Sequence, residues 1–171
     1  MKRPVAVLLG LVVSPLVGLA PAAEAMGGAV CAITGTIAFS PSTLTSTQGA
    51  WRIEPAVISC QGLFKGRERI IGPGSFTGSG FYTAVPTGTG TCMRHLGTGT
   101  VDYTIKTTAT DVHINEQNDF VMAGAGAFAT PSLRGSFQVT PPYDGDCVTK
   151  PLTSATFVAQ ALMVRTAGLA P

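Results

Sequence analysis

Charge is scarce in this 171-residue chain, which has 11 lysine and arginine residues, 9 aspartate and glutamate residues, and a formal net charge of +2. The basic residues are scattered except for the run Lys65–Arg69, and that run also contains Glu68. A domain that binds nucleic acid gathers lysine and arginine on one face or along one element. The sequence has no such cluster, so we do not expect a nucleic-acid partner.

The chain also has only two histidines and lacks the common motifs for nucleotide binding and acyl transfer. It contains neither the Gly-x-Gly-x-x-Gly fingerprint nor a phosphate-binding loop. No serine lies in a Gly-x-Ser-x-Gly elbow. We therefore predict no cofactor, and a non-enzymatic role is favoured.

One pair of residues keeps an enzyme among the alternatives. Asp111 and His113 are two residues apart, so in a strand both side chains point the same way, as a carboxylate that orients an imidazole would. A nucleophile would have to be one of the many serine or threonine hydroxyls. This pair predicts a hydrolase only as an alternative to a polar strand face.

Four cysteines are present, Cys31, Cys60, Cys92 and Cys147, and they lie far apart in the sequence. Zinc sites need close cysteine or histidine pairs, so this spacing argues against a metal site. An even number of cysteines in an exported chain indicates disulfides. We predict two of them.

The first 25 residues have the features of a secretory signal peptide. Lys2 and Arg3 give a positive start, Val5–Ala20 is mostly apolar, and Ala23–Ala25 supplies the small residues that precede cleavage. The apolar run falls short of the roughly 20 residues that span a membrane. We expect cleavage after Ala25, a single domain over 26–171, and a secreted protein without a membrane span.

Beyond this segment, apolar and polar residues alternate along many short stretches. Val101, Tyr103 and Ile105, for example, alternate with polar neighbours, which places the apolar residues on one face of a strand. Short connections make successive strands antiparallel neighbours. The pattern predicts an all-β antiparallel meander of about nine strands in a closed or partly closed barrel, with a β-sandwich as the alternative.

Turn-forming residues set the expected strand boundaries. We expect a break at Gln61–Lys65, turns at Arg94–Gly97, Asn115–Asp119 and Pro141–Gly145, and a single strand that contains Phe120 and all residues to Phe128.

The last predicted strand runs from Ala155 to about Arg165, and both of its faces are largely apolar. We therefore expect it to be buried on both sides or to cover an opening. Small residues on inward positions of a barrel would leave room for a ligand. The glycines expected there are Gly78, Gly80, Gly124 and Gly126.

The disulfide pairing follows from the register of the first hairpin. With Cys31 opposite Cys60, Ile33 falls opposite Ile58, Ile37 opposite Glu54, and Phe39 opposite Arg52. Ile37 against Glu54 is a poor match, and Pro55 suggests a bulge or an edge there. We predict Cys31–Cys60, and Cys92–Cys147 by elimination.

Three short motifs resemble small secreted proteins of high-GC Gram-positive bacteria. They are the opening segment Cys31–Pro41 (CAITGTIAFSP), the TGTGTC segment that ends at Cys92, and the GDC that ends at Cys147. The resemblance implies a secreted all-β domain over most of the mature chain. It implies no activity and no functional residue.

Three functions are therefore carried forward. The first is a secreted, disulfide-stabilised β domain with a non-enzymatic binding or cell-envelope role. The second is a β-barrel that binds a small ligand, and the third is a hydrolase that uses Asp111 and His113. An open apolar interior would favour the second, and a hydroxyl within ~3 Å of His113 would favour the third.

Overall fold

The computed structural model describes residues 28–40, 48–85, 94–123, 125–144 and 153–164. Within these ranges the chain forms nine strands: β1 (Ala29–Ser40), β2 (Gln48–Phe64), β3 (Glu68–Arg69), β4 (Pro73–Val85), β5 (Arg94–Lys106), β6 (Asp111–Ala123), β7 (Ala125–Ala129), β8 (Leu133–Asp144) and β9 (Ser154–Met163). No helix in the described part of the chain has the length and apolar character needed to cross a membrane.

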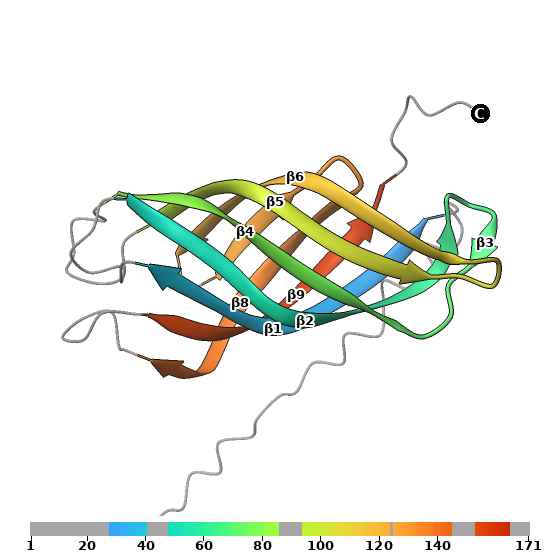
Figure 1. Cartoon of the computed structure of the whole chain (residues 1–171), viewed down its shortest axis with the longest axis horizontal. Helices are drawn as coiled ribbons and strands as arrows, with labels where there is room; N and C mark the ends of the chain where they lie inside the picture. The colour runs from blue at the N-terminus through green and yellow to red at the C-terminus, as the bar shows by residue number, and fades with distance from the viewer. Residues whose placement is uncertain (1–27, 41–47, 86–93, 124, 145–152, 165–171) are drawn as a thin grey trace, which may run out of the picture.

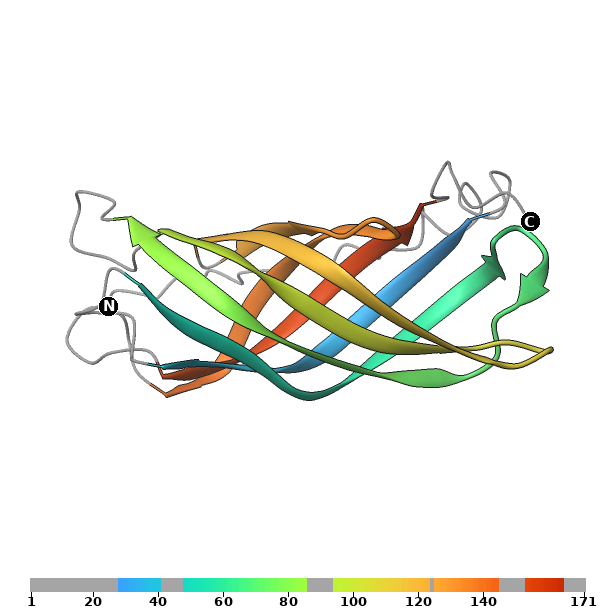
Figure 2. The same ribbon diagram turned by 45° about the horizontal axis from the view of Figure 1, so that its top comes forward.

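Eight of the strands close into an antiparallel barrel (Figure 1). Successive strands are neighbours around the sheet, and β1 closes the ring because it pairs with both β2 and β9. The two-residue β3 lies outside the ring and pairs with the end of β2. Figure 2 shows the strands tilted across the length of the barrel, as closure requires. The predicted barrel is confirmed, and the sandwich alternative is wrong.

The disulfide Cys31–Cys60 is present and joins directly opposed residues of β1 and β2. This confirms the predicted pairing at the start of the hairpin, where Ile33 also lies opposite Ile58. Cys92 and Cys147 lie outside the described residues. A disulfide of this kind is typical of an oxidising compartment.

The far half of the same hairpin corrects the predicted register. Ile37 lies opposite Ile53 rather than Glu54, and Phe39 lies opposite Trp51 rather than Arg52. The cause is an irregularity that gives β2 one more residue than β1 between the two halves, next to Pro55. The bulge turns Trp51 into the barrel, where its side chain is buried.

Two predicted turns lie inside strands. Asn115–Asp119 belongs to β6, and Arg94–Gly97 begins β5. The chain reverses later than expected: β6 ends at Ala123, and Ala125 pairs with it as the first residue of β7. The predicted single strand from Phe120 to Phe128 is therefore a hairpin, in which these two residues lie opposite each other.

Smaller corrections concern the ends of other strands. β2 continues to Phe64 through the expected break, and Pro141–Asp144 continues β8 with a bulge between Thr140 and Tyr143. The last strand has one buried face only, because Val158 and Leu162 are exposed. The apolar outer face of β9 therefore does not cover an opening.

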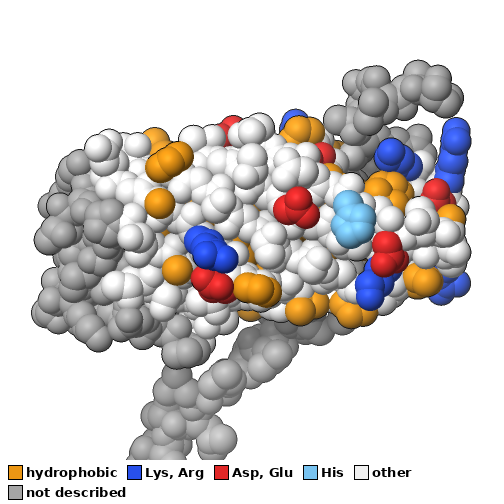
Figure 3. All heavy atoms as spheres, in the orientation of Figure 1, with side chains coloured by type: hydrophobic (Ala, Val, Ile, Leu, Met, Phe, Trp, Pro, Cys, Tyr) orange, Lys and Arg blue, Asp and Glu red, His pale blue; other side chains and the backbone are white. Residues whose placement is uncertain are grey.

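The core is the inner face of the barrel, and it is dominated by aromatic and branched side chains. Its largest fully buried members include Trp51, Tyr82, Tyr103, Ile33 and Leu133. Rings pack edge to face in the Trp51–Phe120 pair, whose centroids are 5.3 Å apart. The outer face carries mostly threonine, serine, glutamine and scattered charged side chains. The exposed large apolar residues among the described ones are Val57, Ile71, Phe81, Leu96, Val158 and Leu162. On the side that Figure 3 shows, hydrophobic and charged side chains are scattered between other groups.

Candidate functional site

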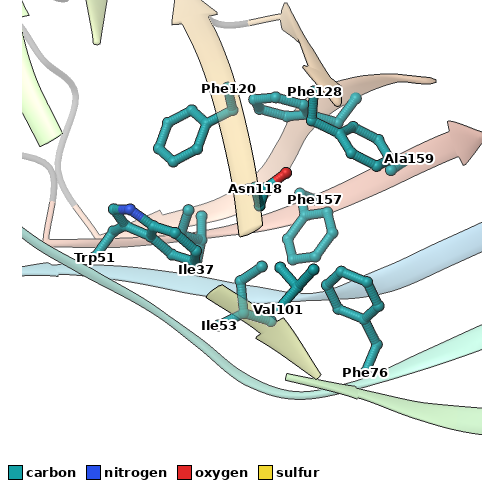
Figure 4. A pocket seen from close by; sticks show the side chains of 11 residues that line it. Ile37, Trp51, Ile53, Phe76, Val101, Asn118, Phe120, Phe128, Phe157 and Ala159 are labelled. Carbon is teal, nitrogen blue, oxygen red and sulfur yellow. The ribbon is translucent and has the colours of Figure 1, made fainter. Parts of the chain in front are cut away.

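A small cavity of about 50 Å³ lies inside the barrel, among the rings that fill it (Figure 4). Every side chain around it except one is a hydrocarbon or an aromatic ring. The lining residues are Ile37, Trp51, Ile53, Phe76, Val101, Asn118, Phe120, Phe128, Phe137, Phe157 and Ala159. They come from all eight barrel strands, so the cavity depends on the closure of the ring.

The glycines expected to line an open interior do not do so. The Trp51 ring covers Gly78, where an added Cβ would lie 3.1 Å from Cζ3, and the Phe137 ring covers Gly126, at 2.7 Å from Cζ. A Cβ at Gly80 would overlap the backbone of β5, and Gly124 lies outside the described residues. Aromatic rings occupy the space that the glycines leave, so the free volume is much smaller than a glycine-lined barrel suggests.

Asn118 is the polar member of the cavity wall. It lies on the inner face of β6, is 5% exposed, and its Oδ1 atom has no hydrogen-bond partner. The residue opposite on β5 is Gly99, which has no side chain to offer. Figure 4 shows the Asn118 amide surrounded by phenylalanine rings. Because buried polar atoms are almost always paired, an orphaned acceptor in an apolar cavity marks a candidate binding site.

A second polar group, Glu116, faces inward two residues before Asn118, and it is well satisfied. Its Oε2 accepts hydrogen bonds from the hydroxyl of Tyr103 at 3.2 Å, from the hydroxyl of Thr130 at 2.6 Å and from the backbone N–H of Ser132 at 3.2 Å. The hydroxyls of Tyr103 and Ser132 are themselves 2.6 Å apart. Burial raises the pKa of the Tyr103 hydroxyl well above its usual range, so the hydroxyl stays protonated at neutral pH. This network fixes the turn between β7 and β8 to the inside of β5 and β6.

The predicted pair Asp111 and His113 lies on the outer face of β6, and both side chains are exposed. The Nδ1 atom of His113 is 3.0 Å from the hydroxyl of Thr104, the opposed residue on β5. Thr104 also accepts a hydrogen bond of 3.4 Å from the hydroxyl of Ser75. A hydroxyl thus lies beside the imidazole, as the hydrolase hypothesis requires.

The rest of that hypothesis finds no support at this place. Among the described residues no hydrogen bond joins Asp111 to His113. The Asp111 carboxylate therefore does not orient the imidazole as the carboxylate of a catalytic triad does. The cavity lies on the opposite face of β6 from His113. An imidazole–hydroxyl contact on an open strand surface has neither a substrate pocket nor oxyanion donors from the cavity wall.

Sequence reasoning missed Asn118 and Glu116 because both lie in the polar run NEQND, which resembles a turn. A usable pattern was nevertheless present. The period of two that places Val112 and Ile114 on one face continues through residues 116 and 118 to Phe120. That alternation would have placed both polar side chains inside the barrel.

Comparison with known proteins adds little. No family model matches the chain, and no curated protein matches it. A search of solved structures finds the crystal structure of Neisserial surface protein A (NspA), with 14% sequence identity, coverage of 80% of this chain and 96% of that chain, and a TM-score of 0.27. A similarity at this level does not bear on function, which has to be argued from the cavity itself.

Proposed function

We propose that this protein is an exported, non-enzymatic binding domain that holds a small, mostly apolar molecule inside its barrel. The observation that carries the proposal is the apolar cavity with its single orphaned acceptor, Asn118 Oδ1. Ligand sites combine an apolar lining with a few placed polar groups, and eight-stranded barrels have an interior that can hold one small ligand. In the part of the chain that the structure describes, His113 lies on an exposed strand face and does not line this cavity, so the hydrolase alternative gains no support from it.

The size of the cavity limits what can bind without rearrangement. An engineered apolar cavity of ~150 Å³ accepts benzene, whereas the cavity here is about 50 Å³. A ring-sized ligand therefore needs the wall to move. Ile53, Phe128 and Phe137 are the wall residues best placed to do so, because all three are only partly buried. β7, which carries Phe128, is also the shortest strand of the barrel, with 5 residues.

Trp51 provides a direct test, because it is the only tryptophan in the chain and it lines the cavity. Xenon, which suits a cavity of this size, and toluene are titrated into the purified mature protein. We expect saturable changes in Trp51 fluorescence and a rise in melting temperature, since a ligand that binds only the folded state stabilises it.

A matched pair of variants assigns the effect to the cavity. Ala159→Val adds two methyl groups to the cavity wall and should abolish the response, whereas Ala127→Val makes the same change on the exposed outer face of β7 and should preserve it. An unchanged response in Ala159→Val, or none in the wild type, would contradict ligand binding inside the barrel.

Export is the second part of the proposal, and it is supported by the N-terminal pattern and by the disulfide Cys31–Cys60. The resemblance of three short motifs to small secreted proteins of high-GC Gram-positive bacteria also favours export. Intact-mass analysis of culture supernatant should find a chain that starts at or near Met26. A full-length chain retained in the membrane fraction would disprove this part.

A further inference from the structure

Few polar side-chain atoms line the cavity. Of its lining residues, only Trp51 and Asn118 have polar side-chain atoms. The Nε1–H of Trp51 donates to the backbone carbonyl of Thr98 at 3.2 Å, so it is already used. The side-chain amide of Asn118 is left: its buried Oδ1 accepts no hydrogen bond, and its Nδ2 donates none among the described residues.

A water molecule is a poor occupant for this place. Buried waters typically make about three hydrogen bonds to protein groups, and a single side-chain amide on an otherwise hydrocarbon wall offers too few. Leaving the Asn118 acceptor empty destabilises the folded protein, since its hydration is lost and nothing replaces it. A single donor attached to an apolar body would satisfy the acceptor and fill the cavity at the same time.

We infer that the ligand is an apolar molecule with one hydrogen-bond donor, a hydroxyl or an N–H, and that Asn118 Oδ1 selects it by accepting that hydrogen bond. This inference rests on the proposed function, because it names the chemical class of the ligand that the same cavity holds. Small alcohols, phenols and indole-like rings belong to this class. Pure hydrocarbons of equal size do not.

The test compares phenol with toluene, which differ by a hydroxyl in place of a methyl group. Binding of each is followed by Trp51 fluorescence in the wild type and in Asn118→Leu, which keeps the number and branching of the side-chain atoms. The ratio of the two dissociation constants in the two proteins isolates the contact between hydroxyl and amide. We expect the preference for phenol to fall about 5–30-fold in Asn118→Leu, as loss of one buried hydrogen bond implies.

The test includes a matched control variant and a variant with a larger cavity. Asn115→Leu makes the same change on the exposed face of the same strand and should leave the ratio unchanged. Phe128→Ala enlarges the cavity, so the comparison can be repeated there if the wild type is too tight for a ring. Asn118→Ala replaces Asn118→Leu if the latter does not fold.

The results separate two kinds of failure. If toluene and phenol bind but their ratio is the same with and without the Asn118 amide, the inference is wrong and the proposed function stands. If neither ligand changes Trp51 fluorescence in the wild type or in Phe128→Ala, the proposed function fails and the inference fails with it.

Discussion

Glu116 and Asn118 lie two residues apart on the inner face of β6, yet only Glu116 has its hydrogen-bond partners. Glu116 accepts three hydrogen bonds from β5 and from the turn between β7 and β8. Asn118 faces Gly99 and a wall of rings, and its Oδ1 accepts none. The first arrangement holds the barrel together. The second weakens it, which is the pattern expected of a site kept for something outside the chain.

The largest effect is expected at Glu116. Glu116→Leu should lower the free energy of unfolding by about 3 kcal/mol, because it removes the acceptor of the Ser132 N–H and leaves the Thr130 hydroxyl with only its longer hydrogen bond to the Leu133 carbonyl. Urea unfolding monitored by Trp51 fluorescence measures the change. Gln117→Leu, on the exposed face, should stay within about 0.5 kcal/mol of the wild type. Equal losses in the two variants would contradict the structural role of Glu116.

An effect at alkaline pH should follow from Tyr103. Burial raises its pKa above the usual 10.0, so the unfolded chain loses the phenolic proton before the folded chain does. The contribution of Tyr103 to the free energy of unfolding is therefore fully present below about pH 10 and is lost as the pH rises further. Melting temperatures across this range should fall less steeply in Tyr103→Phe. Burial also raises the pKa of Tyr82, so some slope should remain, and Tyr82→Phe measures that share.

A smaller effect of opposite sign is expected at Asn118. Asn118→Leu replaces an unpaired polar group by an apolar one, so in the absence of ligand it should leave stability unchanged or raise it by up to about 2 kcal/mol. Urea unfolding again provides the measurement. A loss as large as that of Glu116→Leu would show that Asn118 has a structural partner and would remove the contrast on which its assignment rests.

The smallest effect should come from the outer face of the same strand. His113→Ala removes an exposed side chain whose contact is the Thr104 hydroxyl, so stability should change by less than about 0.5 kcal/mol. Ligand binding should not change at all. A loss of hydrolytic activity in this variant, measured on a panel of ester and peptide substrates, would revive the hydrolase hypothesis.

The sequence predicts the fold best where the alternation of apolar and polar residues is combined with a disulfide. Cys31 opposite Cys60 fixes the first hairpin, and Ile33 and Ile58 then follow without ambiguity. The register fails beyond Pro55, because one extra residue on β2 shifts every later pair and the sequence does not say where a bulge will form.

The candidate site was hidden for a different reason. The local preference of the run NEQND for a turn conflicts with the alternation that continues through it, and pairing with β5 along the whole of β6 decides in favour of the strand. The predicted register, with Phe39 opposite Arg52, likewise did not place Trp51 in the cavity wall. Both outcomes depend on partners distant in the sequence, which a single strand does not reveal.

Pairing of β1 with β9 also bears on how the chain assembles. Ala29 lies opposite Met163, so the ring is closed by the first and last strands, and closure has to await synthesis of the last one. Until then β1 pairs with β2 alone, and the disulfide Cys31–Cys60 can hold these two strands together. The other edge of β1 has no partner strand at that stage. Closure between distant segments is slow, and at high concentration a second chain can donate its own β9 to that edge. Strand-swapped dimers are thus the expected by-product of crowded refolding.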